Sequence, residues 1–361
     1  MRILVVNSGS SSLKLRIVED DDGVSRSDDL PALSQATTAE FAAILQDYGP
    51  IDAVGHRVVH GGSSFAGPVV IDETVVAEIR RLADLAPLHQ PKALAALEAV
   101  SRDFPGIPAV ACFDTAFHSG LPAAAATYAL PREWRERWGL RRYGFHGLSH
   151  AYAAGRAAEF LGRSPVGLRM VTCHLGAGAS LTAIRDGRSV DTTMGFTPLE
   201  GLVMATRSGS VDPGMLLWLQ TSAGMLAGEI VDGLEHRSGL EGLAGTSDMK
   251  EVLAAIEQGA AEARLALDVY IHRLRAGIAS MAASLGGVDC LVFTGGVGEN
   301  SPVVRERALD GLGFMGLALD PERNHGSGDR EIGRVGGTHV LVVLAREDLQ
   351  IAREVRSCLG G

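Results

Sequence analysis

A strand–turn–strand pattern that occurs twice constrains the fold of this chain more than any other feature. Residues 5–18 (VVNSGSSSLKLRIV) and 170–184 (MVTCHLGAGASLTAI) each begin with an apolar β-rich run, pass through a turn of small residues and return as a second β-rich run. With 361 residues, the chain is long enough for two domains, and the repeated layout indicates that they are related by duplication. Two unrelated hairpins with Ser/Gly turns are the alternative.

The segments around these hairpins mix strand and helix periodicity. Further strands are predicted at 51–59, 107–113, 289–294 and 338–344, and helices at 73–85, 91–102, 147–161, 259–285, 301–312 and 347–358. The acidic run at 19–23 (EDDDG) is typical of an exposed turn. The mixture of elements predicts an α/β fold.

Charge and cysteine usage limit the partners and the compartment. The 33 Lys and Arg against 43 Asp and Glu leave a net charge of −10, which argues against a broad cationic surface for nucleic acid or anionic membranes. Cys112, Cys173 and Cys290 lie in apolar runs without C-x-x-C spacing, so we expect buried, reduced thiols in a cytoplasmic protein. The four apolar residues near the N-terminus are too few for a secretory signal.

Glycine is in excess, at 45 of 361 residues or about 12%, against roughly 7% in average proteins. No G-x-x-x-x-G-K-[ST] motif is present, and one G-x-G-x-x-G beginning at Gly311 follows a predicted helix rather than a strand, so P-loop and Rossmann sites are excluded. Three small-residue turns, near 7–12, 176–180 and 295–300, could offer backbone N–H groups to a polyphosphate. Ordinary turns are the alternative.

Four charged or titratable residues lie beside similar segments. Arg57 (GHRVVHGG) and Arg207 (TRSGSVDPG) could bind a carboxylate or phosphate with paired donors, although surface arginines without a role are the alternative. Asp114 ends a predicted strand, a position where parallel sheets often carry chemistry. His146 lies in RRYGFHGLSH, where a structural histidine is the alternative.

Taken together, these motifs resemble the acetate kinase family, within the superfamily of actin, Hsp70 and sugar kinases. The resemblance runs over nearly the whole chain, through NSGSSSLK at 7–14, GHRVVHGG at 55–62, FDTAFH at 113–118, YGFHGLSH at 143–150, HLGAGAS at 174–180, TPLEGLVMATRSGSVDPG at 197–214, FTGGVGENS at 293–301 and REDLQIA at 346–352. The chain is shorter than most sequences of this family, mainly around 19–50 and 320–335.

The resemblance implies two duplicated actin/Hsp70-like (ribonuclease H-like) α/β lobes with a nucleotide cleft between them. The N-terminal lobe would comprise residues 1–115 plus 350–361, and the C-terminal lobe residues 116–349, with the last helix crossing back to the first lobe. It also implies a homodimer through the second lobe.

The implied activity is reversible transfer of the ATP γ-phosphoryl group to acetate, giving acetyl phosphate and ADP, with Mg²⁺ or Mn²⁺. By resemblance, Arg57, Asp114, His146 and Arg207 would be catalytic, the last two stabilising the transition state. Acetate would contact Arg57, Val59, Leu88, Phe145 and Pro198, and the metal would be held by Asn7 and Glu347. The nucleotide would contact Ser10, Ser12, Lys14, His174, Gly176, Gly178, Asp248, Lys250, Gly295, Gly296, Gly298 and Asn300.

The chemistry accounts for these residue types independently. Phosphoryl transfer requires in-line positioning and compensation of charge, which two arginines, a histidine and a divalent metal would supply. An acetate carboxylate, with a pKa close to the value of about 4.3 for Glu, is already ionised at neutral pH and needs no general base. We therefore expect Asp114 to position metal, water or substrate.

Departures from the family pattern leave alternatives open. Ala177 replaces a usual asparagine, Lys250 a usual arginine, and Gln90 and Ala93 usual asparagines, so lower nucleotide affinity or another phosphoryl donor is an alternative. Gly295 and Gly296 would leave room for adenosine, which favours ATP over pyrophosphate. The competing functions are a propionate or butyrate kinase, a non-catalytic nucleotide-driven binding protein of the same superfamily, and an inactive relative.

Overall fold

The computed structural model of the chain describes residues 1–9, 12–31, 44–45, 47–85 and 90–360. They form two compact units: unit 1 is Met1–Gly120, Phe145–Tyr152 and Arg346–Gly361, and unit 2 is Leu121–Gly144 and Ala153–Ala345. Unlike the division expected from the sequence, unit 1 includes residues 145–152. One reason is that the Gly147 N–H donates a hydrogen bond to the Asp114 carbonyl oxygen (2.9 Å), which ties this segment to the end of a unit 1 strand.

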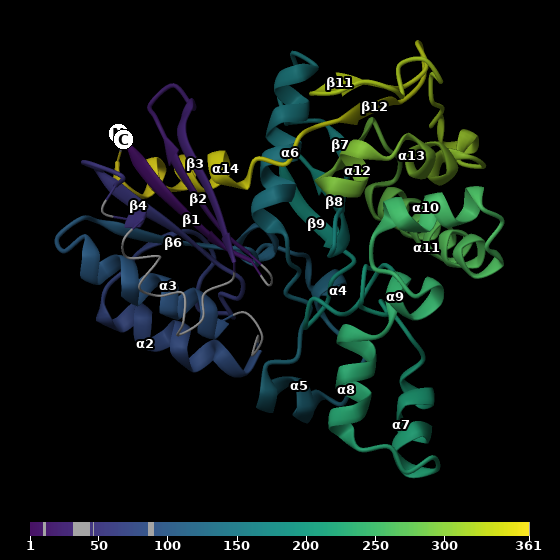
Figure 1. The fold of residues 1–361 in the computed structure, drawn as a ribbon, viewed down its shortest axis with the longest axis horizontal. Helices are drawn as coiled ribbons and strands as arrows, with labels where there is room; N and C mark the ends of the chain where they lie inside the picture. Colours follow the sequence, from purple (N-terminus) through teal and green to yellow (C-terminus); the bar gives the residue numbers. More distant parts are fainter. Residues whose placement is uncertain (10–11, 32–43, 46, 86–89, 361) are drawn as a thin grey trace. The chain divides into compact units, whose positions relative to one another are not determined.

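Unit 1 is built on a six-stranded mixed sheet (Figure 1). Its strands lie in the order β3 (Val24–Pro31), β2 (Ser12–Val18), β1 (Ile3–Ser8), β4 (Ala53–Val58), β6 (Ala109–Phe113) and β5 (Val69–Val70). Strands β1, β4 and β6 are parallel, whereas β2, β3 and β5 run antiparallel to their neighbours. The first turn of the repeated pattern therefore joins β1 to β2.

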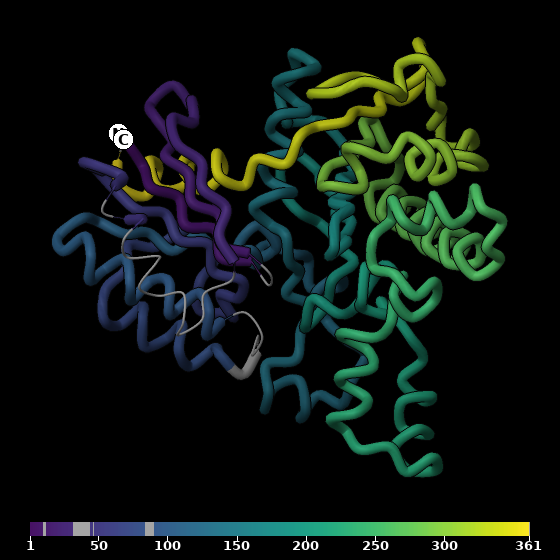
Figure 2. The backbone as a smooth tube through the Cα atoms, in the orientation of Figure 1, coloured from purple at the N-terminus to yellow at the C-terminus, as the bar shows by residue number. Residues whose placement is uncertain are grey.

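Helices cover both faces of this sheet. The last helix, α14 (Glu347–Leu359), lies alongside the strands of this sheet (Figure 2). It is so close to β4 that a Cβ atom at Gly55 would be 2.5 Å from Ile351 Cγ2, which explains glycine in the middle of a strand. On the opposite face, buried side chains such as Leu4 and Val54 pack with Ala96 of α3. The helical elements on this side are α2 (Glu73–Arg81), η1 (Leu82–Leu85) and α3 (Gln90–Asp103), and η2 (Ala116–His118) follows β6.

Unit 2 repeats the same strand order and confirms the predicted duplication. Its sheet runs β11 (Arg330–Glu331), β12 (His339–Val342), β10 (Cys290–Thr294), β7 (Arg169–Leu175), β8 (Ala179–Arg185) and β9 (Arg188–Thr192). Strands β7, β10 and β12 are parallel and correspond to β1, β4 and β6, while β8 and β9 correspond to β2 and β3.

The remaining helical elements belong mostly to unit 2. They are α4 (Ala123–Ala126), α5 (Arg132–Trp138), α6 (Gly147–Phe160, divided between the units at Tyr152), α7 (Pro213–Thr221), α8 (Ala227–His236), α9 (Gly239–Ala244), α10 (Met249–Glu257), α11 (Ala261–Leu285), α12 (Gly295–Asn300), α13 (Pro302–Leu309) and η3 (Gly313–Met315). None of the helices in the described part of the chain combines the length and apolar character needed to cross a membrane.

The local structure departs from the sequence prediction in two ways. Strands β3 and β9 were not predicted, because β3 (VSRSDDLP) and β9 (RSVDT) are largely polar and alternate weakly; pairing with a neighbouring strand determines their conformation. Residues 295–300 form helix α12 rather than a turn. The Glu299 side chain accepts a hydrogen bond from the Gly295 N–H (2.8 Å), which satisfies a donor at the start of this short helix.

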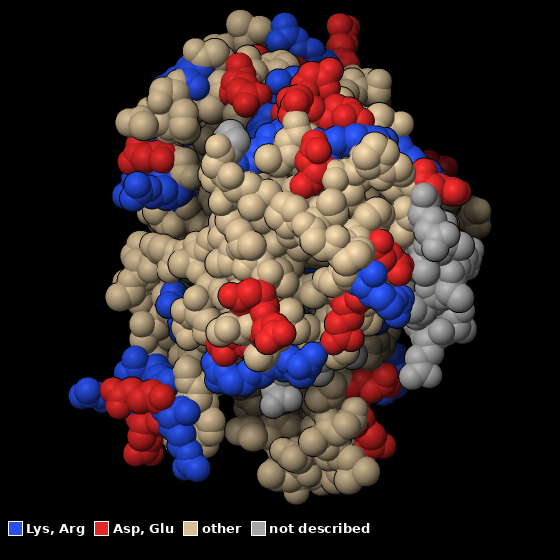
Figure 3. Space-filling view, turned by 90° about the vertical axis from the view of Figure 1, so that its left-hand side faces the viewer, with Lys and Arg blue, Asp and Glu red and all other residues tan. Residues whose placement is uncertain are grey.

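Charges on the surface are mostly balanced locally. Figure 3 shows basic and acidic groups side by side on the face that it presents, without one broad patch of a single sign. Arg356 and Arg353 of α14, for example, both pair with Asp22 in the turn between β2 and β3. These pairs are partly buried and connect the last helix to the β2–β3 turn.

Candidate active-site residues

The first group of candidate residues lies at the carboxyl ends of the parallel strands of unit 1. Asn7 is near the end of β1, Arg57 near the end of β4, and Asp114 directly follows β6. Because parallel strands end at the same edge of a sheet, the fold brings together three residues that are far apart in sequence. Glu347, the first residue of α14, joins them.

Arg57 is the centre of this group. Its Nη2 and Nε donate to the Asp114 carboxylate at 2.6 Å and 3.1 Å, and its Nη1 donates to Asn7 Oδ1 at 3.1 Å. The other end of the Asn7 amide donates to Glu347 Oε2 at 2.8 Å. One guanidinium is thus held by two carboxylates and an amide, with an ion-pair distance of 3.9 Å to Glu347.

Burial destabilises the charged forms of these groups, so the pKa of each depends strongly on its charged neighbours. Asp114 is only 1% exposed, and burial raises the pKa of its carboxyl group while the Arg57 guanidinium opposes that rise. Burial also acts to lower the pKa of Arg57, but the carboxylates of Asp114 and Glu347 outweigh it, so this pKa lies above its ordinary value. Arg57 therefore stays charged at any working pH.

Apolar and histidine side chains lie directly after β4, at Val59 and His60, and directly before α6, at Phe145 and His146. Val59 is 5% exposed and Phe145 is 1% exposed, and the Phe145 ring makes an edge contact with His60 at 5.4 Å between centroids. His146 has a positive φ of 56°, which is rare for a residue with a Cβ and persists only where neighbouring contacts impose it. Leu88 lies outside the described residues.

The first small-residue turn places a lysine beside this group. Lys14 on β2 is paired in register with Asn7 on β1, so the two side chains lie on the same face of the sheet. The turn is closed by a hydrogen bond from the Gly9 N–H to the Ser12 carbonyl oxygen (2.8 Å). Ser10 lies outside the described residues.

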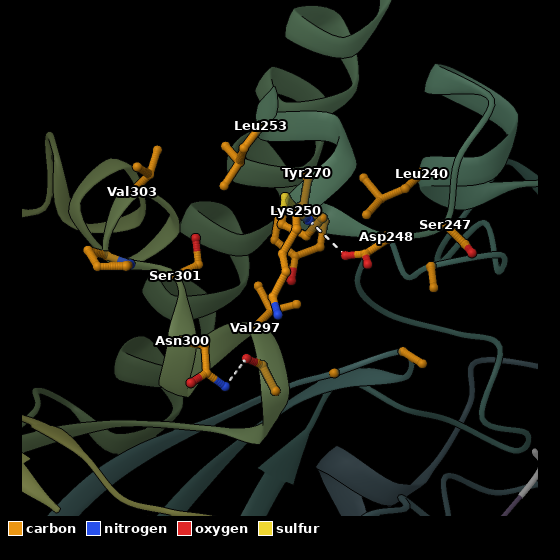
Figure 4. Close-up of a pocket in the computed structure, with 16 residues that line it drawn as sticks. Leu240, Ser247, Asp248, Lys250, Leu253, Tyr270, Val297, Asn300, Ser301 and Val303 are labelled. Carbon is orange, nitrogen blue, oxygen red and sulfur yellow. Dashed lines mark hydrogen bonds between the residues drawn. The ribbon is translucent and has the colours of Figure 1, made fainter. Parts of the chain in front are cut away.

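A second group of candidate residues lines a pocket of about 470 Å³ in unit 2 (Figure 4). Asp248 caps helix α10 by accepting a hydrogen bond from the Lys250 N–H (2.8 Å), and the Lys250 side chain points into the pocket. From the opposite wall, Asn300 Nδ2 donates to the Gly296 carbonyl oxygen (2.9 Å) at the surface of α12. The lining comprises Gly176, Ala177, Ala205, Leu240, Ser247, Asp248, Met249, Lys250, Leu253, Tyr270, Gly296, Val297, Asn300, Ser301, Pro302 and Val303.

Not every predicted nucleotide residue reaches the pocket. Gly295 has φ of 79° and lies against the end of β7, where a Cβ atom would be 2.8 Å from the Leu175 carbonyl oxygen. Gly298 lies on the side of α12 that faces the sheet, where a Cβ atom would be 3.7 Å from the Cys173 carbonyl oxygen of β7. The Gly178 carbonyl oxygen accepts a hydrogen bond from the Gly176 N–H (2.9 Å) within the second turn. His174 lies on β7 opposite Ser180 of β8, at the start of that turn.

Arg207 and Pro198 are also brought together in unit 2. Arg207 Nη1 donates to the Pro198 carbonyl oxygen at 2.8 Å. No carboxylate in the described part of the chain lies within ion-pair distance of this guanidinium, and burial lowers its pKa, while the Glu235 carboxylate acts in the opposite direction. An anion bound beside Arg207 would therefore be attracted by a guanidinium that is not already paired with a carboxylate.

Several pocket residues could not be predicted from local motifs. Leu240, Leu253 and Tyr270 come from three different helices in which they follow ordinary amphipathic or buried periodicity. No signal in the sequence separates them from core positions, because the pocket exists only where these helices meet α12 and the second turn.

The unit 1 group is suited to a hard divalent cation that takes only one or two ligands from the protein. Glu347 and Asn7 supply oxygen atoms, which Mg²⁺ prefers, and Mg²⁺ commonly keeps several waters while binding only one or two protein ligands and phosphate oxygens. Among the residues that the structure describes, no set of three His, Cys, Asp or Glu side chains is arranged to hold a metal ion.

Comparisons with known proteins agree on one family. The model of the Acetokinase family matches residues 23–353. The chain is 51% identical to an acetate kinase of Gloeobacter violaceus, over 92% of this chain and 83% of that protein. The structure is similar to those of an acetate kinase from Porphyromonas gingivalis (37% identity, TM-score 0.92, 99% of each chain) and a propionate kinase from Francisella tularensis (34% identity, TM-score 0.90, 98% of each chain).

Proposed function

The chain belongs to the acetate kinase family of phosphotransferases, which use a carboxyl group as acceptor, and on this premise we propose that it transfers the γ-phosphoryl group of ATP reversibly to acetate. The observation that carries the proposal is the cluster of Asn7, Arg57, Asp114 and Glu347 at one sheet edge. Asp114 and Asn7 hold the partly buried Arg57 guanidinium in place, and an arginine is well suited to bind a carboxylate or phosphate through paired N–H donors.

We propose that unit 2 supplies the nucleotide site. The pocket volume lies within the range of 300–1,000 Å³ that is typical for small-molecule sites, and its walls are largely apolar with Asp248, Lys250 and Asn300 as polar groups. Asp248 could accept hydrogen bonds from a ribose or a base, and Gly296 leaves room because nothing lies within 4 Å of its Cβ position. His174, Gly176 and Gly178 would form the second phosphate turn.

We propose that unit 1 supplies the acyl and first phosphate sites. Arg57 would bind the carboxylate of acetate, and the buried side chains of Val59 and Phe145 would limit the room for its methyl group. Ser12 and Lys14 would line the phosphate side, where Lys14 is paired in register with Asn7. The roles of Leu88, Ser10, Pro198, Gly295 and Gly298 remain predictions from the family resemblance.

The proposed catalytic effect is compensation of charge in the transition state. Arg207 and His146 would donate to the equatorial oxygens of the transferring phosphoryl group, while Asp114 keeps the Arg57 guanidinium in one orientation. No general base is needed, because the acceptor carboxylate is ionised at neutral pH. Glu347 and Asn7 would hold Mg²⁺ or Mn²⁺, which when bound neutralises phosphate charge.

The test is ATP-dependent formation of acyl phosphate, trapped with hydroxylamine, for acetate, propionate and butyrate in parallel. We expect acetate to give the highest kcat/KM, and Arg207→Ala to lose about 10³-fold or more of kcat. A propionate preference would favour the first alternative, which the similarity to a propionate kinase keeps open. Binding of ATP without any acyl phosphate would favour a nucleotide-driven binding protein, and no turnover with ATP but turnover with pyrophosphate would trace back to Ala177.

We propose further that the protein is a homodimer in the cytoplasm. The hairpin of α7 and α8 exposes large apolar side chains, with Leu217 62%, Trp218 58% and Leu226 70% exposed, more than a single soluble chain usually leaves uncovered in one region. The four cysteines are free thiols, as is usual in a reducing compartment. Light scattering should give twice the chain mass, and Trp218→Glu together with Leu226→Asp should give the monomer.

A further inference from the structure

A cluster of three side chains in unit 2 has no role in the function proposed so far. Arg142 Nη2 donates to Glu200 Oε1 at 2.7 Å, and the Tyr128 hydroxyl donates to Glu200 Oε2. The Arg142 guanidinium also lies over the Tyr128 ring, 5.4 Å from its centroid. The Arg142 and Glu200 side chains are 16% and 34% exposed, so the three groups contact one another mostly out of solvent.

The cluster holds the backbone of the segment 193–200. Arg142 Nη1 donates to the carbonyl oxygens of Thr193 (3.1 Å) and Met194 (3.0 Å). The Phe196 N–H donates to the Tyr128 hydroxyl oxygen at 2.9 Å. The Tyr128 hydroxyl is therefore donor to a side chain and acceptor from the backbone at once, which leaves it one orientation.

Gly195 shows how closely this backbone lies against the cluster. A Cβ atom at this position would overlap the Glu200 carboxylate and the Tyr128 hydroxyl. Its carbonyl oxygen accepts hydrogen bonds from the N–H groups of Tyr143 (3.0 Å) and Gly144 (3.2 Å), the two residues that precede Phe145 in the chain. The segment is thus held from both sides, by side chains and by backbone.

The same segment ends next to the proposed catalytic arginine. The Pro198 carbonyl oxygen accepts the hydrogen bond from Arg207 Nη1 at 2.8 Å. Since no carboxylate among the described residues pairs with Arg207, this carbonyl is the contact that orients its guanidinium. A shift of the segment would move the Pro198 carbonyl and the guanidinium with it.

We propose that Tyr128, Arg142 and Glu200 are positioning residues, which fix the segment 193–200 and, through the Pro198 carbonyl, the guanidinium of Arg207. The inference rests on the proposed role of Arg207 in phosphoryl transfer. Misplacing a catalytic group by about 1 Å can cost on the order of 10²-fold in rate, so small displacements of this segment are expected to be visible in kcat.

Tyr128→Phe tests the cluster by deleting one oxygen atom. We expect kcat for acetyl phosphate formation to fall about tenfold or more, while the KM for ATP stays within about twofold of the wild type. The matched control is Tyr143→Phe, whose hydroxyl donates to the Gly139 carbonyl oxygen (3.1 Å), outside the segment. A Tyr128→Phe enzyme with the kcat of the wild type would overturn the proposal, and so would an equal loss of kcat in Tyr128→Phe and Tyr143→Phe.

A double-mutant cycle with Arg207→Lys shows whether Tyr128 acts through the arginine. If it does, Tyr128→Phe costs much less in the Arg207→Lys background than in the wild type, whereas additive losses would contradict the proposal. If Tyr128→Phe does not fold, Glu200→Gln takes its place in the double-mutant cycle.

Hydrogen exchange separates this inference from the proposed function. We expect Tyr128→Phe to increase amide exchange in residues 193–200 and not in β7 or β8, and unchanged exchange in that segment would refute positioning. If Arg207→Lys keeps full activity, the proposed role of Arg207 is wrong, and exchange alone then decides whether the cluster holds the segment.

Discussion

Replacing Arg57 by methionine should destabilise the protein by leaving a buried carboxylate without its counter-charge. Asp114 is 1% exposed, and its carboxylate accepts three hydrogen-bond contacts from Arg57 Nε and Nη2 at 2.6–3.1 Å. Breaking a buried ion pair by removing one partner costs about 3–5 kcal/mol of unfolding free energy. With an unfolding entropy of about 2.1 cal/mol/K per residue, we expect the melting temperature to fall by about 4–7 °C at pH 7.5.

The loss of stability in Arg57→Met should depend on pH in a defined direction. Burial raises the pKa of Asp114 above its unfolded value of 3.8, and loss of Arg57 raises it further, because Arg57 is the group that lowers it. A carboxyl group whose pKa is raised by folding destabilises the protein when it is ionised, and it no longer does so below the unfolded pKa. The stability difference between Arg57→Met and the wild type should therefore be largest at neutral pH and smaller toward pH 4.

Calorimetry on two further variants checks the reasoning. In the double variant Arg57→Met with Asp114→Asn the unpaired charge is gone, so more than half of the lost melting temperature should return at pH 7.5. Arg207→Met is the matched control, because Arg207 has no carboxylate partner among the described residues; it should lose activity without a decrease of that size. Equal melting of the single and double variants, or a difference that grows as the pH falls, would refute the argument.

Three further predictions concern the same residues and the pocket. Asp114→Asn should stay much less active than the wild type even at high pH, because Asp114 positions groups rather than accepting a proton; activity that recovers as pH rises in a rate profile would contradict this. Gly295→Ala should lower stability by about 1–3 kcal/mol, because φ is 79° and the Leu175 backbone is within 3.0 Å of the new Cβ atom, whereas Gly296→Ala should melt like the wild type. Lys250→Arg should lower the KM for ATP about two- to fivefold through stacking on the base, and an unchanged or higher value in initial-rate assays would argue against a base beside this residue.

Much of the fold was predictable because its signals are local. The two strand–turn–strand patterns predict the β1–β2 and β7–β8 hairpins, and the apolar runs that follow predict the parallel strands β4, β6, β10 and β12. The polar strands β3 and β9 were missed, since pairing with β2 and β8 rather than side-chain burial defines them. The segment of α12 is predicted as a turn because glycine is common in turns and disfavours helix. Residue propensities do not report the hydrogen bond from the Gly295 N–H to the Glu299 side chain.

The sequence by itself determined the fold class, the duplication and the identity of the candidate residues. Strand periodicity, glycine-rich turns and the order of the motifs are all local patterns that can be recognised without the structure. Only the tertiary structure decided which of these residues meet. Asn7, Arg57, Asp114 and Glu347 are separated by up to 340 residues and become neighbours because parallel strands end at one edge and the last helix lies against them. The arrangement of Tyr128, Arg142 and Glu200 around one glycine is likewise a property of contacts between distant segments, for which spacing along the sequence carries no signal.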